Sequence, residues 1–293
     1  MLEIDGSRYS GSGTIVRQAV ALAALTGKDI RIINVRLKRP KPGLRRQHVQ
    51  VVESIRQLVG GRAEGVTPGS REIVFRPGKV QINKSYVWDI GSAGSTTALA
   101  IAVLPVLAFG AGEVSIELRG GLFQDFAPSY FHFEQVLLPL LLQMGIQVTV
   151  HMERPGYVPT GGGILRVAVA PVKDTLRSLI RDAGPVERIW GIALSSHLQE
   201  QAVSDRMAEA AKKVFARAGY KAQFTVIYEE SAGQRGAGMA AFADLSDGSR
   251  LGSDRAGAPG RRSEAIGRQV AHNLLGDLAT GASLEGSQPR RFA

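Results

Sequence analysis

The stretch DGSRYSGSGTIVRQAVALAAL, residues 5–25, places a glycine-rich turn directly before an apolar helical pattern. Gly11, Ser12 and Gly13 form the turn, and Arg17 follows about one helical turn into the helix. Backbone N–H groups at a helix start bind phosphate, and a nearby guanidinium adds a permanent positive charge. The turn itself contains no acidic residue, lysine or cysteine. We therefore expect this segment to hold a phosphate group rather than to perform chemistry on it.

Reactive side chains are few in the rest of the chain. There is no cysteine, which excludes disulfides, thiolate catalysis and cysteine-ligated metal sites. Four of the five histidines fall in predicted helices or strands without a converging partner, and we expect them to be structural: His132, His151, His197 and His272. The fifth, His48, could be a catalytic imidazole by residue type alone.

Positive charge is concentrated at the N-terminal end. The formal net charge is +10, and residues 1–62 carry twelve Lys/Arg against four Asp/Glu. The remaining residues are nearly neutral in sum. A basic module of this kind is typical of proteins that bind polyanions, most simply nucleic acid. A solvated basic surface explains the charge alone equally well.

The first 163 residues contain the same pattern twice. Helices are predicted over 11–27, 43–60, 91–110 and 127–145, and strands over 29–37, 71–78, 113–121 and 146–163. A unit of about 80 residues with this order buries one sheet face under two helices, so neighbouring units would share a helical core. We predict an α+β fold of repeated two-helix, four-strand units, with the first repeat over 1–80 and the second over 81–163.

The pattern changes after residue 163. Residues 164–172 resemble the opening strand of a third, incomplete repeat. Residues 173–283 are predicted to form an inserted α/β domain, with strands over 187–196, 221–230 and 236–255 and helices over 198–219 and 263–281. Ser263 is the predicted N-cap of the last helix, and residues 284–293 form an atypical polar tail.

Nothing in the sequence indicates a membrane protein. The N-terminus has no signal-peptide pattern, and the longest apolar runs, such as 136–146, are too short to span a bilayer. We expect a cytoplasmic protein without a membrane partner.

Several segments resemble, in order, the landmarks of the RNA 3′-terminal phosphate cyclases. They are DGSRYSGSGTIVRQAV, RPKPGLRRQH, FRPG, DIGSAGSTT, GYVPTGGG and RRSEAIGRQVAHNLL. Each is weak alone, but their order and spacing are specific, and the resemblance extends from residue 1 to about residue 284. It implies repeats like the C-terminal domain of translation initiation factor three, with a smaller inserted domain.

The resemblance also implies an activity and a set of partners. Members of this family use ATP and a divalent metal, Mg or Mn. They adenylylate themselves on a histidine and convert an RNA 3′-phosphate to a 2′,3′-cyclic phosphate. The expected partners are therefore an RNA with a 3′-phosphate end and a nucleotide.

The resemblance assigns roles to the basic stretch that precedes the second helix. Arg36, Arg39, Arg46, Gln47 and His48 match the family segment that faces the RNA end, and His48 matches a position that is not the nucleophile. Together with Arg17 and the turn at 11–13, these are the predicted RNA- and phosphate-binding residues.

The chain departs from the family where chemistry would be done. Ser10 stands in place of a metal-facing glutamate, Ile101 in place of a glutamine that contacts the nucleotide, and Leu122 in place of a threonine. The segment 256–262 is basic but lacks the family's acid. The family's nucleophilic histidine would lie beyond residue 293. We therefore predict no catalytic residue and no metal ligand within this sequence, and expect the chain as given to be inactive.

Three functions stay open. One is a cyclase by descent, and another is a non-catalytic relative that binds RNA ends or ribonucleoprotein. The third is an enolpyruvyl transferase, which shares the repeat fold, although the inserted module argues against it. The oligomeric state is not predictable.

Overall fold

The structure, a computed structural model, describes residues 1–79, 83–181 and 184–281. The chain divides into two compact units. The first comprises Met1–Gly121, Gly145–Glu153 and Pro159–Leu176, and the second comprises Leu122–Met144, Arg154–Val158 and Arg177–Ala293. Among the described residues, no helix has both the length and the apolar composition needed to cross a bilayer.

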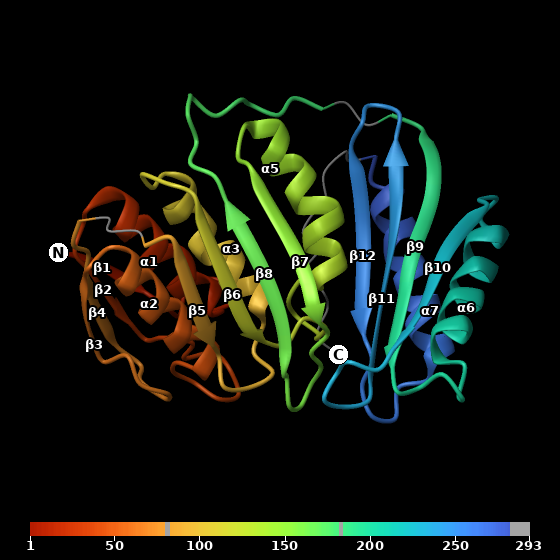
Figure 1. Ribbon diagram of the computed structural model, residues 1–293, viewed down its shortest axis with the longest axis horizontal. Coiled ribbons are helices and arrows are strands. Elements are labelled where there is room, and N and C mark those ends of the chain that lie inside the picture. Colours follow the sequence, from red (N-terminus) through yellow and green to blue (C-terminus); the bar gives the residue numbers. More distant parts are fainter. Residues whose placement is uncertain (80–82, 182–183, 282–293) are drawn as a thin grey trace. The chain divides into compact units, whose positions relative to one another are not determined.

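The first repeat forms a four-stranded mixed sheet with two helices. Its elements are β1 (Leu2–Asp5), α1 (Thr14–Thr26), β2 (Ile30–Ile33), α2 (Arg46–Leu58), β3 (Arg62–Glu64) and β4 (Ile73–Arg76). The strand order is β1-β2-β4-β3, and only the β1–β2 pair is parallel (Figure 1). Alternation explains the strands, because Ile30, Ile32, Ile73 and Phe75 are buried between less buried neighbours.

The second repeat has the same strand order. Its elements are β5 (Ser85–Asp89), α3 (Thr96–Ala108), β6 (Val114–Gly120), β7 (Val148–Arg154) and β8 (Gly163–Val169), with α4 (Tyr130–His132), the π-helix η1 (Phe133–Leu137) and α5 (Leu138–Met144) between β6 and β7. The order β5-β6-β8-β7 repeats β1-β2-β4-β3 position by position. The predicted α+β repeat is therefore confirmed.

One strand was assigned to the wrong sheet from the sequence. Residues 164–172, expected to open a third repeat, instead form most of β8. This strand pairs antiparallel with β6 from Val114↔Val169 to Gly120↔Gly163 and is a neighbour of β7. The reason is that each repeat ends in two strands. The short β3 was not recognised in the first repeat, so only one closing strand was expected in the second.

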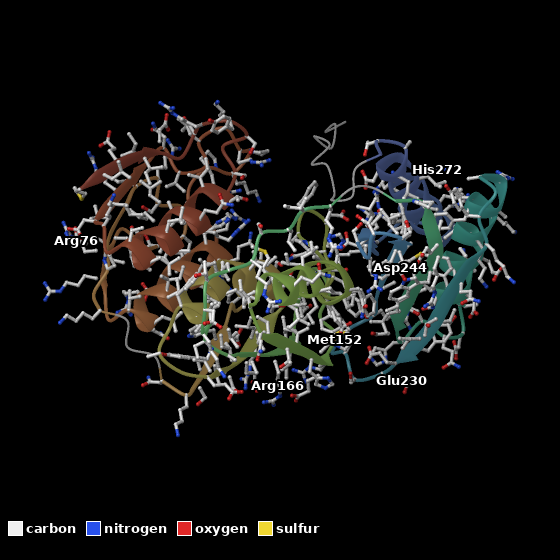
Figure 2. All side chains as sticks on the ribbon, turned by 90° about the horizontal axis from the view of Figure 1, so that it is seen from above. Arg76, Met152, Arg166, Glu230, Asp244 and His272 are labelled. Carbon is white, nitrogen blue, oxygen red and sulfur yellow. The ribbon has the colours of Figure 1, made fainter. Side chains whose placement is uncertain are left out.

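The outer faces of the two sheets carry equivalent ion-pair ladders. Arg76 of β4 pairs with Glu64 and approaches Asp29 to 3.9 Å. Arg166 of β8, the corresponding strand, pairs with Glu153 and with Glu117 at 3.0 Å. Figure 2 labels both arginines on their sheets. Because their side chains are about half exposed, these pairs contribute little stability, but they place the polar face of each sheet outward.

The helices of the first unit form a shared core. Helices α1, α2 and α3 all contact one another. Helix α3 is apolar on nearly every side, with Leu99, Val103 and Leu107 almost fully buried, and Ser95 caps it by accepting a hydrogen bond from the Ala98 N–H at 3.0 Å. The packing of helices from both repeats brings their N-terminal turns into one unit, which matters for the site below.

The inserted domain forms a third four-stranded sheet in the second unit. Its elements are β9 (Val186–Ser196), α6 (Val203–Arg217), β10 (Ala222–Glu229), β11 (Gly236–Leu245), β12 (Arg250–Ala256) and α7 (Ser263–Leu278). The strand order is β10-β9-β11-β12, and α6 and α7 pack together over one face (Figure 1). The predicted N-cap of α7 was wrong by one residue. Arg262 has the extended N-cap backbone, and Ser263 is already helical and buried.

Glycines lie on the face of this third sheet that α6 and α7 do not cover. A Cβ on Gly236 would lie 2.1 Å from the Tyr157 ring, and one on Gly238 would lie 2.4 Å from the Phe123 ring. The two rings stack with centroids 5.5 Å apart. The face is therefore flat enough for the 122–144 and 154–158 segments to dock, which explains why they belong to the second unit.

Candidate phosphate-binding site

The glycine-rich turn ends where α1 begins. Gly11 has a φ of +54°, and its N–H donates to the Arg8 carbonyl at 2.8 Å. Gly13 is the N-cap of α1, and no side chain caps the helix from that position. Ser12 Oγ accepts from the Thr14 N–H at 3.3 Å. The turn thus presents the start of a 13-residue helix, which carries partial positive charge.

The turn is in direct contact with His48. A Cβ on Gly13 would lie only 1.9 Å from His48 Nε2, so no other residue type fits without rearrangement. The imidazole is 2% exposed, and its Nδ1 accepts a hydrogen bond from the Arg45 N–H at 3.0 Å. Since Nδ1 is the acceptor, Nε2 carries the proton of the neutral ring. His48 therefore joins the starts of α1 and α2.

His48 is surrounded by positive charge. Burial and, to a smaller extent, the guanidinium groups of Arg17, Arg36 and Arg45 together lower the pKa of its imidazole to about 3. The ring is thus neutral at physiological pH and cannot share its Nε2 face with a bulky group, since Gly13 occupies that side. This geometry suits a structural centre for the arginines rather than an attacking nucleophile.

Of the arginines around His48, Arg17 and Arg36 are half-buried and Arg45 is exposed. Arg17 Nη2 donates to Thr14 Oγ1 at 3.0 Å, and burial lowers the pKa of Arg17. Arg36 has a φ of +54° and donates from Nη1 to the carbonyls of Lys41 at 2.9 Å and Gly43 at 2.7 Å. Burial, then the charges of Arg45 and Arg39, lower the pKa of Arg36.

Four arginines of the site have no acidic partner among the described residues. Within residues 1–79, 83–181 and 184–281, no ion pair joins Arg17, Arg36, Arg45 or Arg46 to a carboxylate. Like charges this close repel one another, so the cluster gains stability from an added anion. Bidentate guanidinium geometry favours a phosphate or carboxylate as that anion.

Two of the predicted residues face the second glycine turn instead. Arg46 Nη1 donates to the Gly91 carbonyl at 2.7 Å, and Gln47 Oε1 accepts from the Ser95 N–H at 3.2 Å. A surface pocket of the first unit lies here, lined by Leu44, Arg45, Arg46, Gln47, Pro68, Gly69, Ser92 and Gly94. The structure therefore divides the predicted residues between two adjoining places, which meet at the start of α2.

One residue of the cluster was missed from the sequence. Arg45 adjoins His48 through its backbone and lines the pocket beside Arg46. The only signal was its place in the Arg-Arg-Gln-His run, where a single arginine was chosen. Arg39 lies close enough to Arg36 to affect its pKa, in agreement with its expected place in the cluster.

Acidic side chains are scarce near the glycine-rich turn in the described part of the chain. Ser10 is exposed, and the nearest acid to the turn, Asp5, already accepts from the Ser7 N–H at 2.9 Å and from Asn34 Nδ2 at 3.3 Å. In the part of the chain that the structure describes, no group of three His, Cys, Asp or Glu side chains could hold a metal ion. Ile101 of α3 is half-buried.

The other histidines do not gather at this site. His151 is exposed on β7, and His272 is exposed on α7, where Figure 2 labels it. His197 forms a hydrogen bond through Nε2 with the Ala232 carbonyl at 2.7 Å. His132 packs in the second unit beside Gly252. Leu122, which was expected to stand in place of a threonine, is buried in the same unit.

Comparisons with known proteins match nearly the whole chain. The sequence model of the family described as RNA 3′-terminal phosphate cyclase matches residues 8–227, and that of its insert domain matches residues 181–279. The chain is 37% identical over 292 residues to the RNA 3′-terminal phosphate cyclase of Hyperthermus butylicus, covering 97% of this chain and 80% of the relative. It is 36% identical over 291 residues to that of Ignicoccus hospitalis, covering 97% and 81%.

Proposed function

Because this chain belongs to the RNA 3′-terminal phosphate cyclase family, we propose that its arginine cluster binds the 3′-terminal phosphate of an RNA. The observation that carries the proposal is the set of Arg17, Arg36 and Arg45 around one buried neutral imidazole. A terminal phosphate monoester has up to two negative charges, whereas a phosphate within the RNA strand has one. The cluster should therefore prefer the end of the strand.

Each part of the site has a defined task in this proposal. Arg17 and Arg36 supply charge-assisted hydrogen bonds to the phosphate oxygens. The first turn of α1 adds partial positive charge. His48 accepts from the Arg45 N–H and lies against Gly13, so it fixes the start of α2 next to the turn of α1 and stays uncharged. Arg39 and the exposed basic residues nearby bind the preceding phosphates of the strand.

We also propose that the family reaction uses ATP beside this phosphate, with the nucleotide phosphates near Arg46 and Gln47. In that reaction the RNA phosphate receives AMP and the neighbouring 2′-hydroxyl then displaces it, which closes the 2′,3′-cyclic phosphate. The cluster can bind polyphosphate, but its side chains supply no metal ligand, so we assign no step to a metal. The five histidines present have no placement that brings an imidazole to this phosphate as a free nucleophile.

Ser10 and Ile101 favour a second function. Ser10 and Ile101 remove an acid and an amide from places where the family contacts metal and nucleotide. A chain with these changes would bind RNA ends without modifying them. The two functions differ in one product, because only the first gives a protein that carries covalently bound AMP after incubation with labelled ATP.

The proposal is tested with two RNA oligonucleotides that differ only in a 3′-phosphate or a 3′-hydroxyl. One charge-assisted contact contributes roughly 1.5–3 kcal/mol, so the wild type should bind the phosphorylated strand at least about tenfold more tightly. Arg17→Met should remove most of that preference. Arg31→Met is the matched control, because Arg31 is paired with Glu3 and Glu72 on the outer sheet face. Equal affinity of the wild type for the two strands would refute the proposal.

A further inference from the structure

Tyr9 is unusual in both its exposure and its backbone. Its side chain is 91% exposed, more than any other large hydrophobic side chain among the residues that the structure describes. Its φ is +51°, a left-handed conformation that bulky side chains rarely adopt. Strained residues of this kind persist where the surroundings fix them, and they cluster at functional sites.

Neighbouring residues fix the turn that contains Tyr9. The Gly11 N–H donates to the Arg8 carbonyl at 2.8 Å, and Lys38 Nζ lies 3.5 Å from the Tyr9 carbonyl oxygen. A Cβ on Gly11 would be 3.4 Å from Lys38 Cβ, in ordinary van der Waals contact. The turn that presents Tyr9 therefore rests on the loop that carries Lys38.

The loops that carry Tyr9 and Lys38 contain all the described non-glycine residues of the first unit that have a positive φ. Among its described residues, the non-glycine positions with positive φ are Tyr9, Asn34 and Arg36. Asn34 is joined to the first turn through Asp5 at 3.3 Å, and Arg36 belongs to the cluster around His48. The exposed Tyr9 ring and Arg36, one of the cations of the cluster, are thus parts of one adjoining pair of loops.

The chemistry around Tyr9 matches that of a single-stranded nucleic acid end. Arg8, which precedes Tyr9 in the chain, and Lys38, whose Nζ lies 3.5 Å from the Tyr9 carbonyl oxygen, are both exposed. Proteins hold single strands by combining such cations with aromatic rings on which unstacked bases lie. We propose that the Tyr9 ring stacks on the nucleobase of the RNA's 3′-terminal nucleotide, while the arginine cluster binds that nucleotide's phosphate. This inference rests on the proposed function and adds a residue that reads the base.

The test uses substitutions that separate the ring from the turn. Tyr9→Gly removes the ring, and glycine accepts a positive φ without strain, so the turn is kept. Tyr9→Phe keeps the ring and removes the hydroxyl. Phe109→Ala is the matched control, because Phe109 is also an exposed aromatic ring, 53% exposed, at the far end of α3 from the glycine turn that precedes it. Thermal melts by circular dichroism show that each variant is folded.

Affinities are measured for a 3′-phosphorylated oligoribonucleotide, for the same strand with an abasic 3′-terminal nucleotide, and for the 3′-hydroxyl strand. Tyr9→Gly should weaken binding of the intact phosphorylated strand roughly five- to hundredfold and leave the abasic strand unaffected. Tyr9→Phe and Phe109→Ala should bind like the wild type.

Two different failures can be told apart. If the wild type prefers the 3′-phosphate but Tyr9→Gly binds the intact strand equally well, or weakens the abasic strand to the same extent, the stacking role is wrong and the proposed function stands. A Tyr9→Gly defect confined to ATP binding would also refute stacking on RNA. If the wild type shows no preference for the 3′-phosphate, both proposals are wrong.

Discussion

The buried imidazole of His48 should make the first unit sensitive to acid. Its pKa is about 3 in the folded chain against an ordinary value of 6.5. Between these two values the unfolded chain binds a proton that the folded chain does not, so stability falls as the pH falls. Lowering the pH from 7 to 4.5 should remove roughly 2–3 kcal/mol through this residue alone. Its contribution is fully present above about pH 6.5 and is lost progressively toward pH 3.

The assay follows urea unfolding by tryptophan fluorescence. Trp88 lies in β5 of the first unit and Trp190 in β9 of the second, so a Trp190→Phe background leaves one reporter of the first unit. His48→Asn keeps an acceptor for the Arg45 N–H but cannot be protonated. The matched control is His272→Asn, which removes an exposed imidazole from α7.

Carboxylates also titrate in this pH range, and they affect the wild type and His48→Asn equally. The difference between the free energies of unfolding of the two proteins therefore gives the contribution of His48 alone. The free energy of unfolding of the wild type should fall by roughly 2–3 kcal/mol more than that of His48→Asn between pH 7 and pH 4.5. His272→Asn should follow the wild type. Identical pH dependence in the wild type and His48→Asn would show that the imidazole is not held neutral by burial and the nearby arginines.

Three further predictions concern binding and packing. RNA binding should weaken as salt is added, and log K should fall against log salt with a slope of roughly −3 to −4 if four to six phosphates are contacted. Replacing Arg39 and Arg46 by Ala should make this slope less steep. Binding that does not depend on salt would contradict the prediction. Gly13→Ala should lower the free energy of unfolding by about 1–3 kcal/mol in a denaturant titration, because the new Cβ would clash with the His48 imidazole. Gly276→Ala should not lower it, because no atom lies within 4 Å of a Cβ at that position. If Ser10 stands in place of the family's acid, as we propose, Mg-ATP should bind at least about tenfold more weakly than it would with that charge-assisted contact. Micromolar binding by calorimetry would contradict this.

The repeat architecture could be predicted because it depends on local patterns. Alternating apolar residues such as Ile30 and Ile32 marked the strands, and glycines such as Gly27, which has a φ of +68° at the end of α1, marked helix ends. The placement of β8 could not be predicted. A strand's partners depend on contacts with distant segments, and its residues alternate in the same way whichever sheet they join.

The site was predictable only as a set of residue types. Arg17, Arg36, Arg39 and Arg46 were predicted as cations near a phosphate turn, together with Gln47 and His48. The contact of His48 with Gly13 could not be predicted from the sequence, because it forms only when α1 and α2 pack together. Tyr9 gave no signal either, since its importance lies in its exposure and its positive φ, and both are tertiary properties.

The central claim is that the 3′-terminal phosphate of an RNA lies among the guanidinium groups around His48. A ³¹P NMR titration of a 3′-phosphorylated oligonucleotide, saturated with the protein, measures this environment directly. The second pKa of a free phosphate monoester is about 6, and neighbouring cations should lower it by about one unit or more, because they stabilise the dianion. Arg17→Met, at saturating concentration, should return it toward the free value. A saturated wild-type complex whose 3′-phosphate still titrates near pH 6 would contradict the account.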